Sequence, residues 1–116
     1  MDKKAKAAAY QKQYRLKYPN RVRSTDLKKS FGITLEQYNE MLEKQNGVCM
    51  ICKSPETVID NRTKQPRNLA VDHCHTTKKV RGLLCMSCNQ GLGNFRDNPD
   101  FLAKAISYLI NSLHLS

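Results

Sequence analysis

At 116 residues the chain can form one compact domain with an appendage, and so small a core gains stability from a structural metal. The net charge of +10 is unevenly spread, because residues 1–30 carry ten lysines and arginines against two aspartates. No apolar stretch is long enough to span a bilayer and no secretory signal is recognisable, so we expect a cytoplasmic protein that is not secreted and has no membrane partner.

Residues 1–30 are predicted to form a basic helical arm. A helix is expected over residues 3–18, with its tyrosines at i, i+4 and i+8 on one face, namely Tyr10, Tyr14 and Tyr18. Pro19 ends that helix, and a short helix over residues 26–31 follows. A tyrosine stripe at this spacing is more typical of a packing face than of a surface that stacks on bases.

The positive charge of the arm makes nucleic acid the leading partner, because a polyanion that binds there releases its counterions. A solvated tail that only maintains solubility is the alternative. The residues that we expect to contact DNA are Lys3, Lys4, Lys12, Arg15, Lys17, Arg21, Arg23, Lys28, Lys29 and, outside the arm, Arg81. For Arg81, an exposed strand charge with no ligand is an equal alternative.

Residues 31–116 are predicted to form the second unit. Thr34 and Gln37 match a capping box that begins a helix, and the polar stretch of residues 53–68 is typical of a loop. Residues 69–71 and 80–84 are expected to pair as an antiparallel hairpin. The last helix begins at Pro99, and its apolar face is expected to cover the core. That face and the tyrosine stripe either form a homodimer or close a monomer.

Two Cys-x-x-Cys motifs flank this hairpin and predict a structural zinc site. Cys49, Cys52, Cys85 and Cys88 supply four sulfurs, which complete a tetrahedral shell and leave no position open for chemistry. The fifth cysteine, Cys74, is expected to be a half-buried thiol. An odd number of cysteines in a reducing compartment favours metal binding over disulfides. Redox-active thiols are the alternative, although a shared ion would suppress their reactivity.

Asp72, His73 and His75 lie between the cysteine motifs and are free to serve a second, harder metal held by oxygen ligands. Asn89 follows the last zinc ligand directly, so a bound ion would fix its position relative to the hairpin. Side chains alternate along a regular strand, so Asp72 and His73 reach one ion only if strand geometry ends there. We therefore expect the first strand to end at Val71 or Asp72, with His73 in a loop.

The ordered motifs resemble the phage recombination endonuclease VII family, a branch of the His-Me finger (HNH-type) nucleases. The resemblance covers residues 27–109 and rests on Phe31-Gly32-Ile33-Thr34 with Gln37-Tyr38, Cys49-x-x-Cys52, Val71-Asp72-His73-Cys74-His75 and Val80-Arg81-Gly82-Leu83-Leu84-Cys85-x-x-Cys88-Asn89. It implies a small α+β fold in which a ββα-metal core with a structural zinc is flanked by helices. It also implies a catalytic Mg²⁺ or Mn²⁺ and cleavage of DNA, with recombination intermediates or other branched DNA as candidate substrates.

The resemblance assigns roles residue by residue. Asp72 and Asn89 would hold the divalent ion, and His73 would be the general base, a role that suits imidazole at neutral pH. His75 would orient the scissile phosphate or support His73. Some family members carry a carboxylate where this chain has Leu92, which cannot ligate a metal. A non-catalytic zinc ribbon that binds DNA or recruits a partner remains the alternative function, and DNA affinity without Mg²⁺-dependent cleavage would distinguish it.

Overall fold

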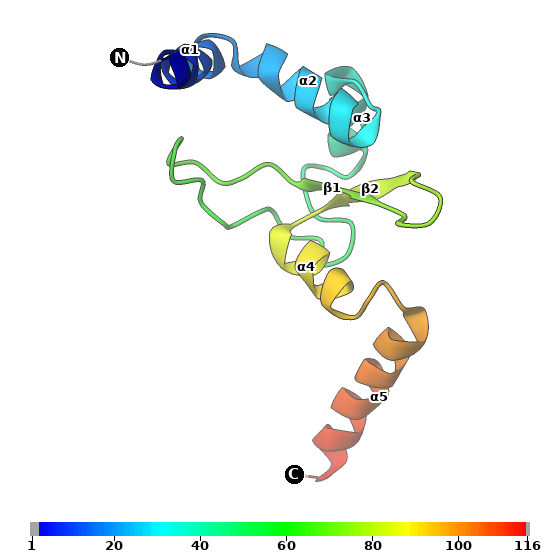
Figure 1. The fold of residues 1–116 in the computed structure, drawn as a ribbon. Helices are drawn as coiled ribbons and strands as arrows, with labels where there is room; N and C mark the ends of the chain where they lie inside the picture. The colour runs from blue at the N-terminus through cyan, green and yellow to red at the C-terminus, as the bar shows by residue number, and fades with distance from the viewer. Residues whose placement is uncertain (1–2, 116) are drawn as a thin grey trace.

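The computed structural model describes residues 3–115, and the side chains of residues 3–112, as an elongated chain of helices around one hairpin (Figure 1). The elements in chain order are α1 (Lys3–Lys17), α2 (Pro19–Phe31), α3 (Leu35–Lys44), β1 (Ala70–His73), β2 (Val80–Leu84), α4 (Met86–Asn94) and α5 (Pro99–Leu115). The longest dimension is 64 Å, and α1 and α5 lie at opposite ends of the molecule. The radius of gyration is 18.4 Å, whereas a compact domain of this length has about 13 Å.

The basic arm consists of two helices. Pro19 ends α1 as predicted, but it also begins α2, so the short helix expected over residues 26–31 is twice that length. Proline suits a first helical position because its missing N–H would have no intrahelical partner there. Gly32 ends α2 with a left-handed φ of 70°, which a residue without Cβ adopts at no steric cost.

The tyrosine stripe runs along α1 to Tyr18, the residue between α1 and α2, and it packs on itself and not on the core. Ring centroids lie 6.4 Å apart for Tyr10 and Tyr14 and 5.0 Å apart for Tyr14 and Tyr18. Within Lys3–Lys17, all of which the structure describes, no residue is buried. Helix α1 therefore adds charge and exposed surface, while α2 contributes Leu27 to the core.

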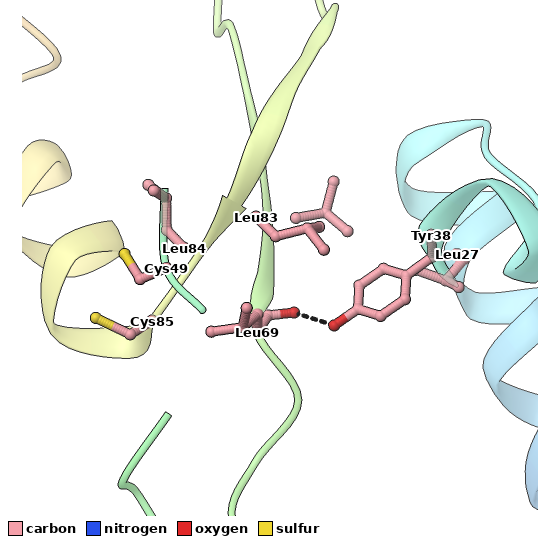
Figure 2. Close-up of a cluster of buried hydrophobic side chains, with 8 residues drawn as sticks. Leu27, Tyr38, Cys49, Leu69, Leu83, Leu84 and Cys85 are labelled. Atoms are coloured by element: carbon pink, nitrogen blue, oxygen red, sulfur yellow. Dashed lines mark hydrogen bonds between the residues drawn. The ribbon is translucent and has the colours of Figure 1, made fainter. Parts of the chain in front are cut away.

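The core lies between α2, α3 and the hairpin, and it extends to the cysteine motifs (Figure 2). The predicted capping box is present, since the Thr34 side chain accepts from the N–H of Gln37 and Gln37 accepts from the N–H of Thr34. Helix α3 buries Tyr38, whose hydroxyl donates to the carbonyl of Leu69 at 2.7 Å. That bond fixes the start of the hairpin against α3.

The hairpin is antiparallel and irregular at one position. Asp72 pairs with Gly82 and His73 pairs with Val80, so Arg81 is the extra residue of a bulge. Strand β1 continues through His73, which corrects the expectation that the strand ends before it. The departure from strand geometry is on β2 instead, because a bulge changes the direction of side chains without ending the strand.

Helix α5 does not cover the core, contrary to the expectation from its apolar face. It extends away from α4, and Ile106, Leu109 and Ile110 are half or more exposed (Figure 1). Arg96 and Asp97, both with positive φ, form the turn that sets its direction. The core is already closed by α2 and α3 on the hairpin. No helix within residues 3–115 has the length and apolar character that a membrane span requires.

Candidate functional site

The four paired cysteines converge on one point. Their sulfurs all lie within 4.8 Å of one another, and those of Cys52 and Cys85 are 3.8 Å apart. A tetrahedral zinc with Zn–S bonds of about 2.3 Å requires sulfur–sulfur distances of about 3.8 Å. The donor set and its dimensions therefore fit zinc. Cys74 does not join this group of described side chains and is half-buried, as predicted.

Backbone N–H groups donate hydrogen bonds to the cysteine sulfurs and so stabilise the negative charge that a cation requires. The N–H of Ile51 donates to Cys49 Sγ and that of Cys88 donates to Cys85 Sγ, each at 3.4 Å. Burial opposes ionisation of Cys49, but these and neighbouring N–H donors outweigh it and lower its pKa to about 6. Burial and the adjacent sulfurs raise the pKa of Cys88 to about 12. Ionisation of one thiol is thus favoured, while ionisation of a second, neighbouring thiol is disfavoured.

Two polar side chains that the sequence motifs did not reveal connect the cysteine motifs to the fold. Glu56 is buried in the predicted loop, and its carboxylate accepts from the N–H of Met86 at 2.7 Å, at the start of α4. Gln45 is buried and bonds both the N–H and the carbonyl of Leu83, at 3.0 and 2.9 Å. No local pattern reveals these links, because Met86 is 30 positions from Glu56 and Leu83 is 38 positions from Gln45.

The proposed catalytic residues line one cleft of about 490 Å³, here called the His73 cleft. Its polar lining includes Asp72 and His73 from β1, His75 from the hairpin turn and Asn89 from the first turns of α4, together with Arg23 and Asn68. The hairpin and α4 bring these side chains together although Asn89 is 17 positions beyond Asp72. Leu92, which replaces a carboxylate of some family members, packs against the core instead.

His73 is held between two rings. Its centroid lies 5.6 Å from that of Phe31 on α2 and 5.0 Å from that of His75. His73 is half-buried whereas His75 is exposed. The Phe31 contact limits the positions that the imidazole can adopt, while His75, which also lines the cleft, is exposed to solvent.

Arg81 forms ion pairs with two aspartates at the site. Its Nε and Nη2 donate to the two oxygens of Asp72, both at 2.8 Å, and Nη2 also lies 2.9 Å from the carboxylate of Asp97. The hydrogen bond to Asp72 is the main cause of the raised pKa of Arg81. Asp97 follows α4 in the left-handed turn and was not predicted, since only the tertiary structure brings it to the hairpin. The predicted phosphate contact of Arg81 stays a prediction.

The basic residues of the arm differ in position. Arg23 is half-buried, lines the His73 cleft, and its Cζ lies 4.3 Å from the centroid of the Tyr38 ring. Arg15 pairs with Asp26 at 3.8 Å, and both side chains are largely exposed. The others predicted to bind DNA are exposed on α1 and α2, namely Lys3, Lys4, Lys12, Lys17, Arg21, Lys28 and Lys29. Arg23 is therefore the one cation of this predicted set that both belongs to α2 and lines the cleft.

Comparison with known proteins agrees with this architecture. A family model described as recombination endonuclease VII matches residues 24–111. The Gene 59 protein of Mycobacterium phage L5 is 35% identical over 107 residues, which are 91% of this chain and 61% of that protein. The Gene 59 protein of Mycobacterium phage D29 is 34% identical over 105 residues, 90% and 59% of the respective chains.

This chain thus spans about three fifths of the length of these curated relatives. The family match includes both cysteine motifs, the hairpin between them and the helix that carries Asn89. The resemblance predicted from the motifs is confirmed, and the protein belongs to the recombination endonuclease VII family.

Proposed function

We propose that this protein is a divalent-metal-dependent nuclease that hydrolyses phosphodiester bonds in DNA. One observation carries the proposal: Asp72, His73, His75 and Asn89 line a single cleft in a chain of the endonuclease VII family. The family description names recombination, so branched DNA is the first substrate class to test. The zinc cluster supports the site by holding α4, and therefore Asn89, against the hairpin.

His73 is the general base in this proposal. Its imidazole takes the proton of the attacking water, a contribution of about 10² to 10⁴-fold to the rate. The packing of Phe31 and His75 around the ring restrains its orientation. His75, exposed beside it, donates to a phosphate oxygen and helps to align the scissile bond.

Asp72 and Asn89 are the proposed ligands of Mg²⁺ or Mn²⁺. Both residues line the His73 cleft and carry a side-chain oxygen, the donor type that these hard cations prefer. Arg81 holds both carboxylate oxygens of Asp72, which fixes the carboxylate and leaves further lone pairs on each oxygen for a cation. When bound, the ion would neutralise charge that develops on the phosphate and on the leaving oxygen.

The basic arm would supply sequence-independent affinity for DNA. Residues 1–30 carry a net charge of +8, and most of their cations are exposed on α1 and α2. Arg23 extends this positive surface into the His73 cleft. In this proposal the arm (residues 1–30) binds DNA and the zinc-stabilised unit (residues 31–116) cleaves it. Helix α2 links the two units through Leu27, which lies in the core.

The test is cleavage of labelled linear, supercoiled and four-way-junction DNA, with and without Mg²⁺, by the wild type and by His73→Ala at matched zinc content. We expect the wild type to cut only with the divalent ion. The variant should bind DNA equally well but cut about 10² to 10⁴-fold more slowly. Thermal melting of the variant controls for its fold. DNA binding without cleavage of any substrate by the wild type would instead favour a zinc-ribbon binding module.

A further inference from the structure

The His73 cleft continues beyond the proposed catalytic residues. A second cleft of about 410 Å³, here called the Arg96 cleft, is lined by Cys74, Thr76, Arg81, Arg96 and Asp97. His75 and Gly93 line both clefts, so the two adjoin along these residues. The Asp72–Arg81 ion pair lies at the same junction, because Asp72 lines one cleft and Arg81 the other.

Gly93 adds no side chain to this junction, and the fold does not require glycine at this position. It is exposed on α4, it is not among the residues with positive φ, and a Cβ placed on it would meet nothing within 4 Å. Glycine in a helix costs about 0.5–1 kcal/mol relative to alanine. Neither backbone conformation nor packing therefore requires glycine here. Unlike Gly91, which also has open space around it, Gly93 lines both clefts and adds no side chain to them.

Besides Arg81, which is paired with Asp72 and Asp97, each cleft is lined by one further arginine. Arg23 in the His73 cleft is anchored on the ring of buried Tyr38. Arg96 in the Arg96 cleft lies 5.9 Å from the centroid of the Phe101 ring. Guanidinium groups match the geometry of phosphate oxygens and are well suited to hold a phosphodiester backbone. Positive charge thus lies on both sides of the His75–Gly93 junction.

We propose that the two clefts form one channel for a single DNA strand, whose sugar–phosphate backbone passes closest to α4 at Gly93. Arg23 binds a phosphate on one side of the scissile group and Arg96 binds a phosphate on the other. This inference rests on the proposed nuclease function and adds to it the path of the strand and the residues that hold it. It assigns a substrate-binding role to Gly93 and Arg96.

The first test fills the channel. Gly93→Leu should leave the melting temperature unchanged or raised, because leucine favours helix and its Cβ would meet no atom within 4 Å. It should lower kcat/KM for DNA cleavage by about 10²-fold, the scale of loss when a reacting group is misplaced. The matched control is Gly91→Leu, since Gly91 lies in the same helix, also has open space, and lines neither cleft. It should cut like the wild type.

Cleavage by Gly93→Leu at the wild-type rate would overturn the channel. If the leucine lowered the melting temperature, Gly93→Ala and Gly91→Ala would replace the pair, because alanine is the strongest helix former. Failure of the wild type to cut any DNA would count against the proposed function itself. The two failures are therefore distinguishable, since only the second involves the unaltered protein.

The second test locates the phosphates. The His73→Ala protein, whose cleavage should be slow enough for binding to be measured, is used here. Replacing single phosphates by neutral methylphosphonates should weaken its binding at positions on both sides of the cleavage point. Adding Arg23→Ala should abolish the sensitivity on one side only, and adding Arg96→Ala that on the other. Arg62→Ala is the control, because Arg62 is exposed in the 53–68 loop. An identical sensitivity profile in all variants would contradict the assignment.

Discussion

At the scale of single residues, Asp72 shows how a neighbour fixes the orientation of a carboxylate. The Asp72 side chain is 11% exposed, and Arg81 satisfies both of its carboxylate oxygens while Asp97 holds Arg81 from the other side. Such a carboxylate cannot rotate freely, so a cation that binds it meets a fixed ligand. The bulge at Arg81 brings the guanidinium to the carboxylate on the facing strand.

Arg81→Ala should therefore destabilise the protein and make its stability sensitive to Mg²⁺. Leaving a buried acceptor without its donors costs about 1–3 kcal/mol, and the lower half of that range applies because Arg81 itself is 38% exposed and screened by water. Added Mg²⁺ should raise the melting temperature of the variant more than that of the wild type, since the ion compensates the Asp72 charge. Equal Mg²⁺ effects would contradict the proposed ligand role. Arg62→Ala, which breaks an exposed pair with Asp60, should melt like the wild type.

At the scale of elements, the zinc cluster joins segments that have few other contacts. It connects the loop after α3 to the start of α4, while Gln45 and Glu56 fix each cysteine motif to the hairpin or the helix. The small core of two strands and parts of two helices would otherwise leave α4 poorly held. A zinc ion bound to the four cysteines would therefore also help to hold Asn89 in the His73 cleft.

Zinc binding should release protons and weaken as the pH falls. At pH 7 the metal-free Cys88 retains its proton because its pKa is raised to about 12, whereas Cys49 with a pKa of about 6 is already ionised. Zinc must displace the Cys88 proton, so the apparent affinity rises with pH and falls more steeply below pH 6, where Cys49 also protonates. Calorimetry in buffers of different ionisation enthalpy measures the release. Cys74→Ser should leave it unchanged, and heats that do not depend on the buffer would contradict it.

At the scale of the whole molecule, the basic helix α1 and the proposed catalytic residues lie in different parts of a structure that is 64 Å long. Helix α1 lies at one end, the hairpin of β1 and β2 in the middle and α5 at the other end (Figure 1). The cations of α1 are exposed. Because no residue of α1 (Lys3–Lys17) is buried, the helix can act on DNA affinity without supporting the fold. Long-range attraction to a polyanion suits such an exposed group of cations.

Removal of residues 1–17 should weaken DNA binding and leave the melting temperature unchanged. The deletion takes away six basic residues, and each lost phosphate contact should reduce the slope of log affinity against log salt by about 0.9. Cleavage at saturating DNA should persist, because every proposed catalytic residue remains. A variant with the six residues replaced by glutamine separates the effect of charge from that of the helix. An unchanged salt slope in both proteins would show that α1 does not contact DNA.

The sequence by itself determined the features whose cause is local. The capping box at Thr34, the two cysteine motifs and the antiparallel hairpin follow from residue types at short, fixed spacing, and the structure confirms each. The order of these motifs also identified the family, which the comparison confirms. Short covalent separation limits the geometries available to such residues, so a pattern alone predicts them.

Only the tertiary structure decided the features that depend on distant contacts. Alternation along β1 gave no sign of the Arg81 bulge, nor did any motif reveal Asp97, Glu56 or Gln45. The apolar face of α5 was correctly recognised, but periodicity shows that a face is apolar and not what it packs against. All elements compete to pack against one small core, and this competition selects the packing partners. A local sequence pattern carries no information about its outcome.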